Sequence, residues 1–154
     1  MLLPSPILFI CAGNLCRSPF AEAYMRKRLE QGGAYAECFS RGLLSMPGRR
    51  VPAVAQKIAE EFEVDLSHHV SQTLLAPDLD RAALVMVMEN GQRQHLSKMR
   101  PAHIGKVMML SQPNGGEKID DPMGRSEDTF RRVYNEIVDH VDAWTERFGI
   151  EVSG

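Results

Sequence analysis

Short apolar runs alternate with segments of helical periodicity along this chain of 154 residues. Four runs have the length and composition of buried strands, at residues 7–10, 36–39, 84–88 and 107–110. Apolar side chains at helical spacing predict helices that begin near Ser18, Pro52, Gly91 and Ser126. Strands that alternate with helices indicate an α/β fold in three layers, with a central four-stranded parallel sheet flanked by helices.

Two of the predicted helices have specific start signals. Ser18 can cap free amides and Pro19 fits the first helical turn, while the glycine pair at residues 32–33 ends that helix. Ser126 is a second predicted cap, and the acidic residues that follow it suit the positive end of a helix. The loop before Ser18 therefore lies at the carboxyl end of the first strand, where parallel sheets bind ligands.

Composition and charge narrow the class of protein. With 18 Lys+Arg, 20 Asp+Glu and 44% hydrophobic residues, the chain resembles an ordinary soluble protein, and we expect one domain over residues 1–154. The absence of a basic block disfavours nucleic acid as a partner. We expect no membrane insertion, because the longest apolar stretch is far shorter than the roughly 20 residues that span a bilayer. We further expect a cytoplasmic monomer with no metal and no cofactor.

The segment from Cys11 to Ser18, with sequence CAGNLCRS, carries the candidate chemistry. A glycine-containing loop between a strand and a helix can turn successive amide N–H groups inward and bind a phosphate. Arg17 can hold two phosphoryl oxygens, and the same positive field favours a thiolate at Cys11. The segment therefore predicts a phosphate-binding loop after the first strand, with Cys11 as a nucleophile toward phosphorus.

Each of these residues also has a purely structural interpretation. Cys11 can simply continue the buried strand, with Arg17 as a surface cation. Cys16 is either a filler of the core or a partner that forms a reversible disulfide with Cys11 and protects it from over-oxidation. Cys38 lies in a predicted strand, and we expect it in the core. Three cysteines are too few, and odd in number, for a disulfide framework.

These motifs, in this order, resemble the low molecular weight protein tyrosine phosphatases, whose signature C-x5-R-[ST] stands here at residues 11–18. Later landmarks also match: Ser40 begins a segment similar to the family's Ser-Ala-Gly, His69 matches its histidine, and Glu89 its acid after methionine. The resemblance implies Cys11 and Arg17 as catalytic residues. It also implies a phosphate-binding loop made of Ala12, Gly13, Asn14, Leu15, Cys16, Arg17 and Ser18, supported by Asn14, Ser18, Ser40 and His69.

A phosphatase of this kind needs an acid that protonates the departing phenolate and then activates water. The sequence contains two adjacent candidates, Asp120 and Asp121, and their positions in the chain alone do not identify which is the acid. The resemblance selects Asp121, which directly precedes Pro122. The alternative interpretation is that both aspartates are surface residues of a turn with no catalytic role, because Asp and Pro are common turn residues.

Leu15 bears on the substrate. Arginine phosphatases of this fold carry Thr at the matching position, so the resemblance favours phosphotyrosine and leaves phosphoarginine as the alternative. A phosphate-binding module without catalysis is a third possibility. Thioredoxin-linked arsenate reductases are disfavoured, because no cysteine follows Cys38. Leu44 and Met123 stand where eukaryotic members carry aromatic residues beside the cleft, which implies a looser clamp on the ring.

The segments at residues 84–90, 101–106 and 121–128 are similar to bacterial phosphatases paired with the tyrosine autokinases of capsule and exopolysaccharide export. The resemblance therefore implies that the partner is a phosphotyrosine protein, the C-terminal tail of such a kinase. A phosphorylated tail is a flexible polyanion, and four arginines on predicted loops can attract it. They are Arg41, Arg49, Arg50 and Arg125.

Overall fold

The computed structural model describes residues 2–44 and 46–152. Its four strands form one parallel sheet in the order β2-β1-β3-β4. The strands are β1 (Ile7–Cys11), β2 (Cys38–Gly42), β3 (Leu84–Val87) and β4 (Val107–Met109). The helices are α1 (Arg17–Gln31), α2 (Ala53–Glu60), α3 (Ala76–Arg81), α4 (Asn90–Met99) and α5 (Glu127–Arg147), with short 3-10 helices at Pro101–Lys106 and Gln112–Asn114.

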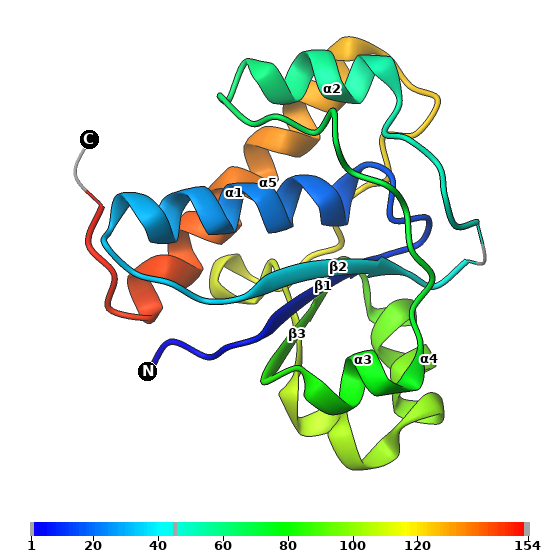
Figure 1. Ribbon diagram of the computed structural model, residues 1–154, viewed down its shortest axis with the longest axis vertical. Helices are drawn as coiled ribbons and strands as arrows, with labels where there is room; N and C mark the ends of the chain where they lie inside the picture. The colour runs from blue at the N-terminus through cyan, green and yellow to red at the C-terminus, as the bar shows by residue number, and fades with distance from the viewer. Residues whose placement is uncertain (1, 45, 153–154) are drawn as a thin grey trace.

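Helices cover both faces of the sheet, as predicted. Figure 1 shows α1, α2 and α5 on one face and α3 and α4 on the other. The alternation of side chains along β1 explains this: Ile7 and Phe9 belong to the core beneath α1 and α5, whereas Leu8 and Ile10 belong to the core beneath α3 and α4. The prediction of a three-layer α/β fold is confirmed.

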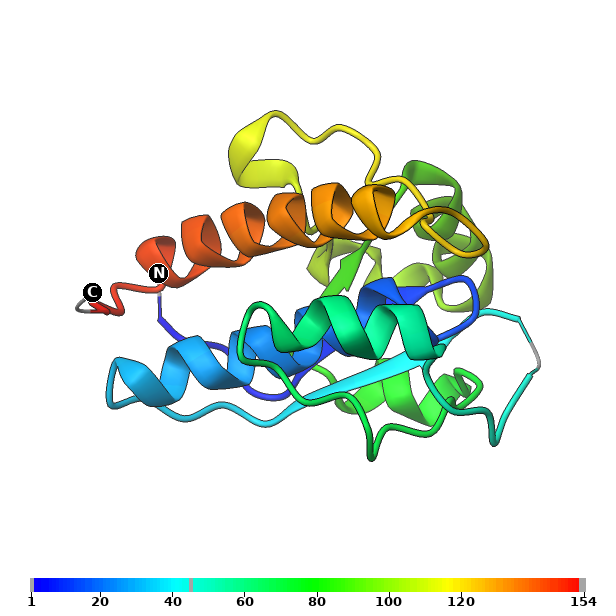
Figure 2. The same cartoon turned by 90° about the horizontal axis from the view of Figure 1, so that it is seen from above.

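The strand order places a topological switch at β1. The chain goes from β1 to β2 on one side, and later returns to β3 on the other side of β1. Connections therefore diverge at the carboxyl end of β1, which leaves a crevice there. Both chain termini lie at the opposite end of the molecule, as the two views in Figures 1 and 2 show.

Three local predictions need correction. The second strand runs over Cys38–Gly42 rather than residues 36–39, because it continues to pair with β1 through the polar Ser40 and Arg41. The helix α3 was not predicted, since six residues are too short for a helical period. Ser18 does not cap α1, which begins at Arg17, because its hydroxyl contacts Cys11 instead.

Other local predictions are confirmed. The hydroxyl of Ser126 accepts a hydrogen bond from the backbone N–H of Thr129 at 3.2 Å, so it caps α5. Cys38 is buried at 5% exposure. The capped helix is the longest in the fold and packs along α1.

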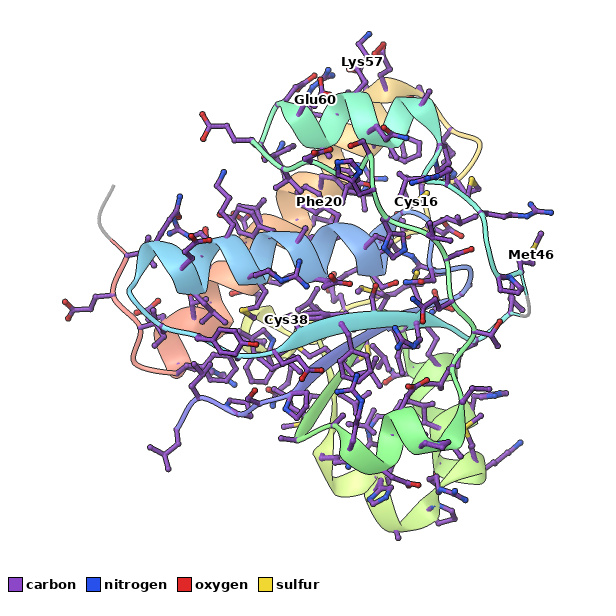
Figure 3. The ribbon with its side chains drawn as sticks, viewed as in Figure 1. Cys16, Phe20, Cys38, Met46, Lys57 and Glu60 are labelled. Carbon is purple, nitrogen blue, oxygen red and sulfur yellow. The ribbon has the colours of Figure 1, made fainter. Side chains whose placement is uncertain are left out.

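Stacked aromatic rings join α5 to the start of α1. The ring of Tyr134 lies parallel to that of Phe20, with centroids 3.9 Å apart. Its hydroxyl donates a hydrogen bond of 3.0 Å to the carbonyl oxygen of Cys16. Figure 3 shows Phe20 between α1 and α2. The long helix is therefore tied to the last turn of the loop that precedes α1.

We expect Tyr134→Phe to lower the free energy of unfolding by about 1–3 kcal/mol, because it leaves the buried carbonyl of Cys16 without a partner. Urea denaturation followed by circular dichroism measures this. Tyr35→Phe is the matched control, since Tyr35 is 80% exposed and its substitution should change nothing. Equal stability of the two variants would mean that the hydrogen bond contributes nothing.

Candidate active site

The loop between β1 and α1 lies in the crevice at the switch point. It runs beside the segment that follows β2, as Figure 1 shows, and two backbone hydrogen bonds join them: Leu43 N–H to Cys11 O at 3.1 Å and Leu44 N–H to Ala12 O at 2.8 Å. Within the described part of the chain, no carbonyl or side chain accepts a hydrogen bond from the N–H groups of residues 13–16. Those amides are available to an anion.

Cys11 is the last residue of β1 and is 3% exposed. Its sulfur lies 2.9 Å from the hydroxyl oxygen of Ser18, in the first turn of α1. The hydroxyl of Ser18 accepts from the amide of Asn14, so its own proton is free to be donated to the sulfur of Cys11. The end of β1 and the first turn of α1 together thus position the sulfur of Cys11 beside the loop.

Asn14 is the centre of the hydrogen bonds that shape this loop. It has a φ of 56°, in the left-handed region, and its side chain is fully buried. Its amide nitrogen donates to the hydroxyls of Ser18 and Ser40, each at 2.9 Å, while its amide oxygen accepts from the N–H of Gln72 at 2.9 Å. His69 Nε2 donates to the carbonyl of Asn14 at 3.0 Å. The structure therefore brings together Asn14, Ser18, Ser40 and His69.

Glu22 extends this network and was not among the predicted residues. Ser40 donates to its carboxylate at 2.7 Å, and Arg26 pairs with the same carboxylate at 2.6 Å. Glu22 lies four residues after Ser18, on the same face of α1. That helical spacing is the one signal in the sequence that could have indicated it.

Arg17 is 2% exposed and reaches across to two other segments. Its Nη1 donates to the carboxylate of Glu89 at 3.1 Å and to the carbonyl of Ile119 at 2.8 Å. Its Nη2 lies 3.9 Å from a carboxylate oxygen of Asp121. Among the described residues, Nε and Nη2 make no hydrogen bond, so both can bind phosphoryl oxygens.

The two adjacent carboxylates point to different places. Asp121 lines the same cleft as Cys11 and Arg17, and its Oδ1 accepts a hydrogen bond of 3.1 Å from Met123 N–H. Asp120 instead pairs with Arg132 of α5 at 3.4 Å. Only Asp121 of the two therefore faces the nucleophile.

The cleft above the loop has a volume of about 290 Å³. Apolar side chains form most of its walls: Leu15, Leu44, Met46 and Met123. Figure 3 shows Met46 on the outside of the segment after β2. Leu44 and Met123 are respectively 56% and 42% exposed, as expected for residues at the rim.

The four predicted anion-attracting arginines do not share one position. Arg49 lines the cleft. Arg41 pairs with Asp78 at 3.3 Å on the other side of β2, and Arg50 donates to a backbone carbonyl at 3.1 Å. Arg125 is exposed on the segment that follows Asp121. Of the four, only Arg49 is among the described residues that line the cleft.

Cys16 lies in the same loop as Cys11, and both are free thiols. Burial raises the pKa of the Cys16 thiol far above its ordinary value, and the neighbouring Cys11 raises it further. Cys16 therefore stays protonated at neutral pH and is not a second nucleophile. No described residues cluster as His, Cys, Asp and Glu ligands for a metal ion, and no helix in the described ranges could cross a membrane.

Comparison with known proteins identifies the family. Residues 6–153 match the model of the low molecular weight phosphotyrosine protein phosphatases. The chain belongs to this family. The loop of free amides, with Cys11 and the buried Arg17 beside it, is therefore the candidate active site of a member of this family.

The relatives include proteins named as tyrosine phosphatases. The chain is 31% identical to the probable low molecular weight protein-tyrosine-phosphatase EpsP of Ralstonia nicotianae, over 92% of this chain and 94% of EpsP. The crystal structure of the tyrosine phosphatase AmsI of Erwinia amylovora is 30% identical and superposes with a TM-score of 0.88, over 94% and 93% of the two chains.

The arginine phosphatase YwlE of Geobacillus stearothermophilus has the same fold. It is 27% identical, with a TM-score of 0.83, over 93% of this chain and 92% of YwlE. The fold therefore does not distinguish phosphotyrosine from phosphoarginine. The choice between these two substrates must therefore depend on the side chains in the cleft.

We expect Gly42→Ala to lower kcat/KM by at least about tenfold, because small displacements of a reacting group are costly. A Cβ at Gly42 would lie 2.9 Å from the carbonyl carbon of Gly13 and 3.0 Å from Asn14 N, so it would push the loop away from β2. Steady-state hydrolysis of p-nitrophenyl phosphate measures this. Gly105→Ala is the control, since nothing lies within 4 Å of a Cβ there. An unimpaired Gly42→Ala enzyme would contradict the close approach.

Proposed function

We propose that this protein hydrolyses phosphotyrosine in proteins through a cysteinyl-phosphate, with Cys11, Arg17 and Asp121 as its catalytic residues. The observation that carries the proposal is that these three side chains line one cleft, above a loop of free amides. Phosphate dianions are bound by such loops, and arginine adds bidentate contacts.

In the first step, the thiolate of Cys11 attacks phosphorus while the bond from phosphorus to the phenolic oxygen breaks. The loop amides and Arg17 stabilise the charge on the three equatorial oxygens. Asp121, in its protonated form, gives its proton to the departing phenolate. Tyrosine leaves, and the phosphoryl group stays on sulfur.

In the second step, the Asp121 carboxylate takes a proton from a water molecule as the water attacks phosphorus. The bond from sulfur to phosphorus breaks, and the electron pair returns to Cys11 as a thiolate. Inorganic phosphate leaves. The hydroxyl of Ser18 lies 2.9 Å from the sulfur of Cys11. It stabilises the thiolate as nucleophile in the first step and as leaving group in the second.

Around this centre, Asn14, Ser40 and His69 keep the loop in its bound shape. The buried side chain of Asn14 makes hydrogen bonds to three partners and cannot change rotamer without losing all of them. His69 holds the backbone carbonyl of the same residue. The six loop residues Ala12 to Arg17, together with Ser18, surround the phosphoryl group. Under oxidation by a peroxide, Cys11 becomes a sulfenic acid, and the thiol of Cys16 in the same loop then attacks this sulfur, forming a protective disulfide and releasing water.

The apolar walls favour phosphotyrosine over phosphoarginine. Leu15 is 9% exposed and faces the cleft, where it can pack on a phenyl ring. A guanidinium group in the same place would leave its N–H groups without partners at Leu15. The substrate is therefore an aromatic phosphate monoester.

For a partner, we propose the phosphorylated tail of a bacterial tyrosine autokinase in exopolysaccharide or capsule production, which the cytoplasmic enzyme meets as a monomer. The support is the similarity to the phosphatases EpsP and AmsI, together with Arg49 in the lining of the cleft and the exposed Arg125 on the segment after Asp121. A polyphosphorylated tail is an anion that these arginines attract.

We expect Cys11→Ser to abolish phosphate release from a phosphotyrosine peptide in dithiothreitol and EDTA, because the nucleophile is lost. Asp121→Asn should lower kcat by about 10²–10⁴-fold, the usual contribution of a general acid. Asp120→Asn is its matched control, since that carboxylate pairs with Arg132 outside the cleft.

Malachite green detection measures phosphate release by the wild type and by the Cys11→Ser, Asp121→Asn and Asp120→Asn variants. Phosphate binding without turnover by the wild type would favour the phosphate-binding module instead. Turnover that survives Cys11→Ser would rule out the cysteinyl-phosphate.

Side-by-side assays of phosphotyrosine and phosphoarginine peptides test the choice of substrate. We expect turnover of phosphotyrosine only, and we expect Leu15→Thr to lower it while admitting phosphoarginine, because a hydroxyl can accept from the guanidinium group. Faster hydrolysis of phosphoarginine by the wild type would assign the protein to the arginine phosphatases.

A further inference from the structure

A second depression adjoins the catalytic cleft, on the side of α4. It has a volume of about 270 Å³, close to the 290 Å³ of the cleft itself. Ala12 and Leu44 line both, so one wall separates them. The remaining lining residues are Leu43, Glu89, Gly91, Gln92 and His95.

Main-chain hydrogen bonds hold the backbone of the shared wall in place. The N–H groups of Leu43 and Leu44 donate to the carbonyls of Cys11 and Ala12 at 3.1 and 2.8 Å. Gln92 is 5% exposed, and its side-chain oxygen accepts a hydrogen bond of 2.8 Å from Met88 N–H. The depression is therefore preformed in the protein, as small binding sites usually are.

Its chemistry excludes an acidic occupant. Three aliphatic side chains, of Ala12, Leu43 and Leu44, face it, while Glu89 contributes a carboxylate that already pairs with Arg17. A carboxylate entering beside Glu89 would be repelled and would lose its hydration. An uncharged apolar or aromatic side chain would bury its surface against the aliphatic residues.

Resting on the proposed function, we propose that this depression binds the apolar side chain of a residue that flanks the phosphotyrosine in the substrate. Side chains in an extended peptide follow one another at about 3.3 Å per residue along the backbone, so a residue within two positions of the phosphotyrosine reaches across one wall. The protein thus selects phosphotyrosine sites with an uncharged apolar neighbour and rejects sites with an acidic one.

Gly91 offers a way to fill the depression without touching the catalytic groups. It lies in the first turn of α4, and nothing is within 4 Å of a Cβ built there. Replacement of glycine in a helix also favours folding. Gly91→Phe should therefore place a ring in the depression of a folded enzyme, and Gly105→Phe is the matched control at another open glycine.

The experiment compares kcat/KM for free phosphotyrosine and for peptides that carry Leu, Phe, Gly or Glu at each of the two positions on either side of phosphotyrosine. For the wild type, we expect Leu or Phe at one position to exceed Gly by about tenfold, as burial of part of an apolar side chain provides. Glu at that position should fall below Gly.

Gly91→Phe should reduce kcat/KM for the Leu and Phe peptides to the value for the Gly peptide and leave kcat/KM for free phosphotyrosine unchanged. Gly105→Phe should change neither value. His95→Glu, on the exposed rim, should deepen the rejection of the Glu peptide about threefold through a second like charge.

Equal kcat/KM for all peptides would overturn the inference. A preference for the Leu and Phe peptides that survives Gly91→Phe would also overturn it, as would a rejection of the Glu peptide that His95→Glu leaves unchanged. Failure of the wild type to hydrolyse free phosphotyrosine would overturn the proposed function, and this inference with it.

Discussion

The fully buried side chain of Asn14 is the constraint on which the site depends. A left-handed residue in a tight loop is tolerated by asparagine better than by most other residues. Its amide then joins the start of α1, through Ser18, to β2, through Ser40, and to the segment at Gln72. The loop that would hold phosphate is therefore fixed from three directions before any substrate arrives, which is the preorganisation that electrostatic catalysis requires.

Arg17 extends that constraint to the other half of the sheet. Its guanidinium group connects α1 to Glu89, after β3, and to the segment that carries Asp121. A buried arginine needs partners for its charge, and the carboxylate of Glu89 and the carbonyl of Ile119 supply them. The same contacts fix the direction of the remaining N–H groups. The side chain that is proposed to stabilise the transferred phosphate thus also lies 3.9 Å from the proposed acid, Asp121.

Much of the fold and of the site could be predicted from the sequence, because the decisive signals are local. The run Ile7 to Ile10 is buried on both faces, so its composition alone indicates a central strand. The motif at residues 11–18 is contiguous, and so is the loop. Glu22 was missed because it acts through Ser40, a contact between a helix and a strand that are distant in sequence.

The choice between Asp120 and Asp121 shows the same limit. Adjacent carboxylates look alike in a sequence, and only the position of Arg132, on another helix, turns one of them away from the cleft. The helix α3 was missed for a different reason, since six residues with a proline in the first turn have no measurable period. Tertiary contacts thus decide what local patterns leave open.

The rim of the cleft suggests how selectivity arises without aromatic clamps. Leu44 and Met123 are flexible, largely exposed side chains, which hold a ring less firmly than a stacked aromatic would. If contacts with the phosphotyrosine ring provide less binding energy, contacts with the residues that flank it must provide more. Leu44 also forms the wall of the neighbouring depression, so a side chain bound there would press on the same residue that contacts the ring. Occupation of the depression by the correct peptide would then order the rim, and binding energy from a remote residue would be used at the reacting centre.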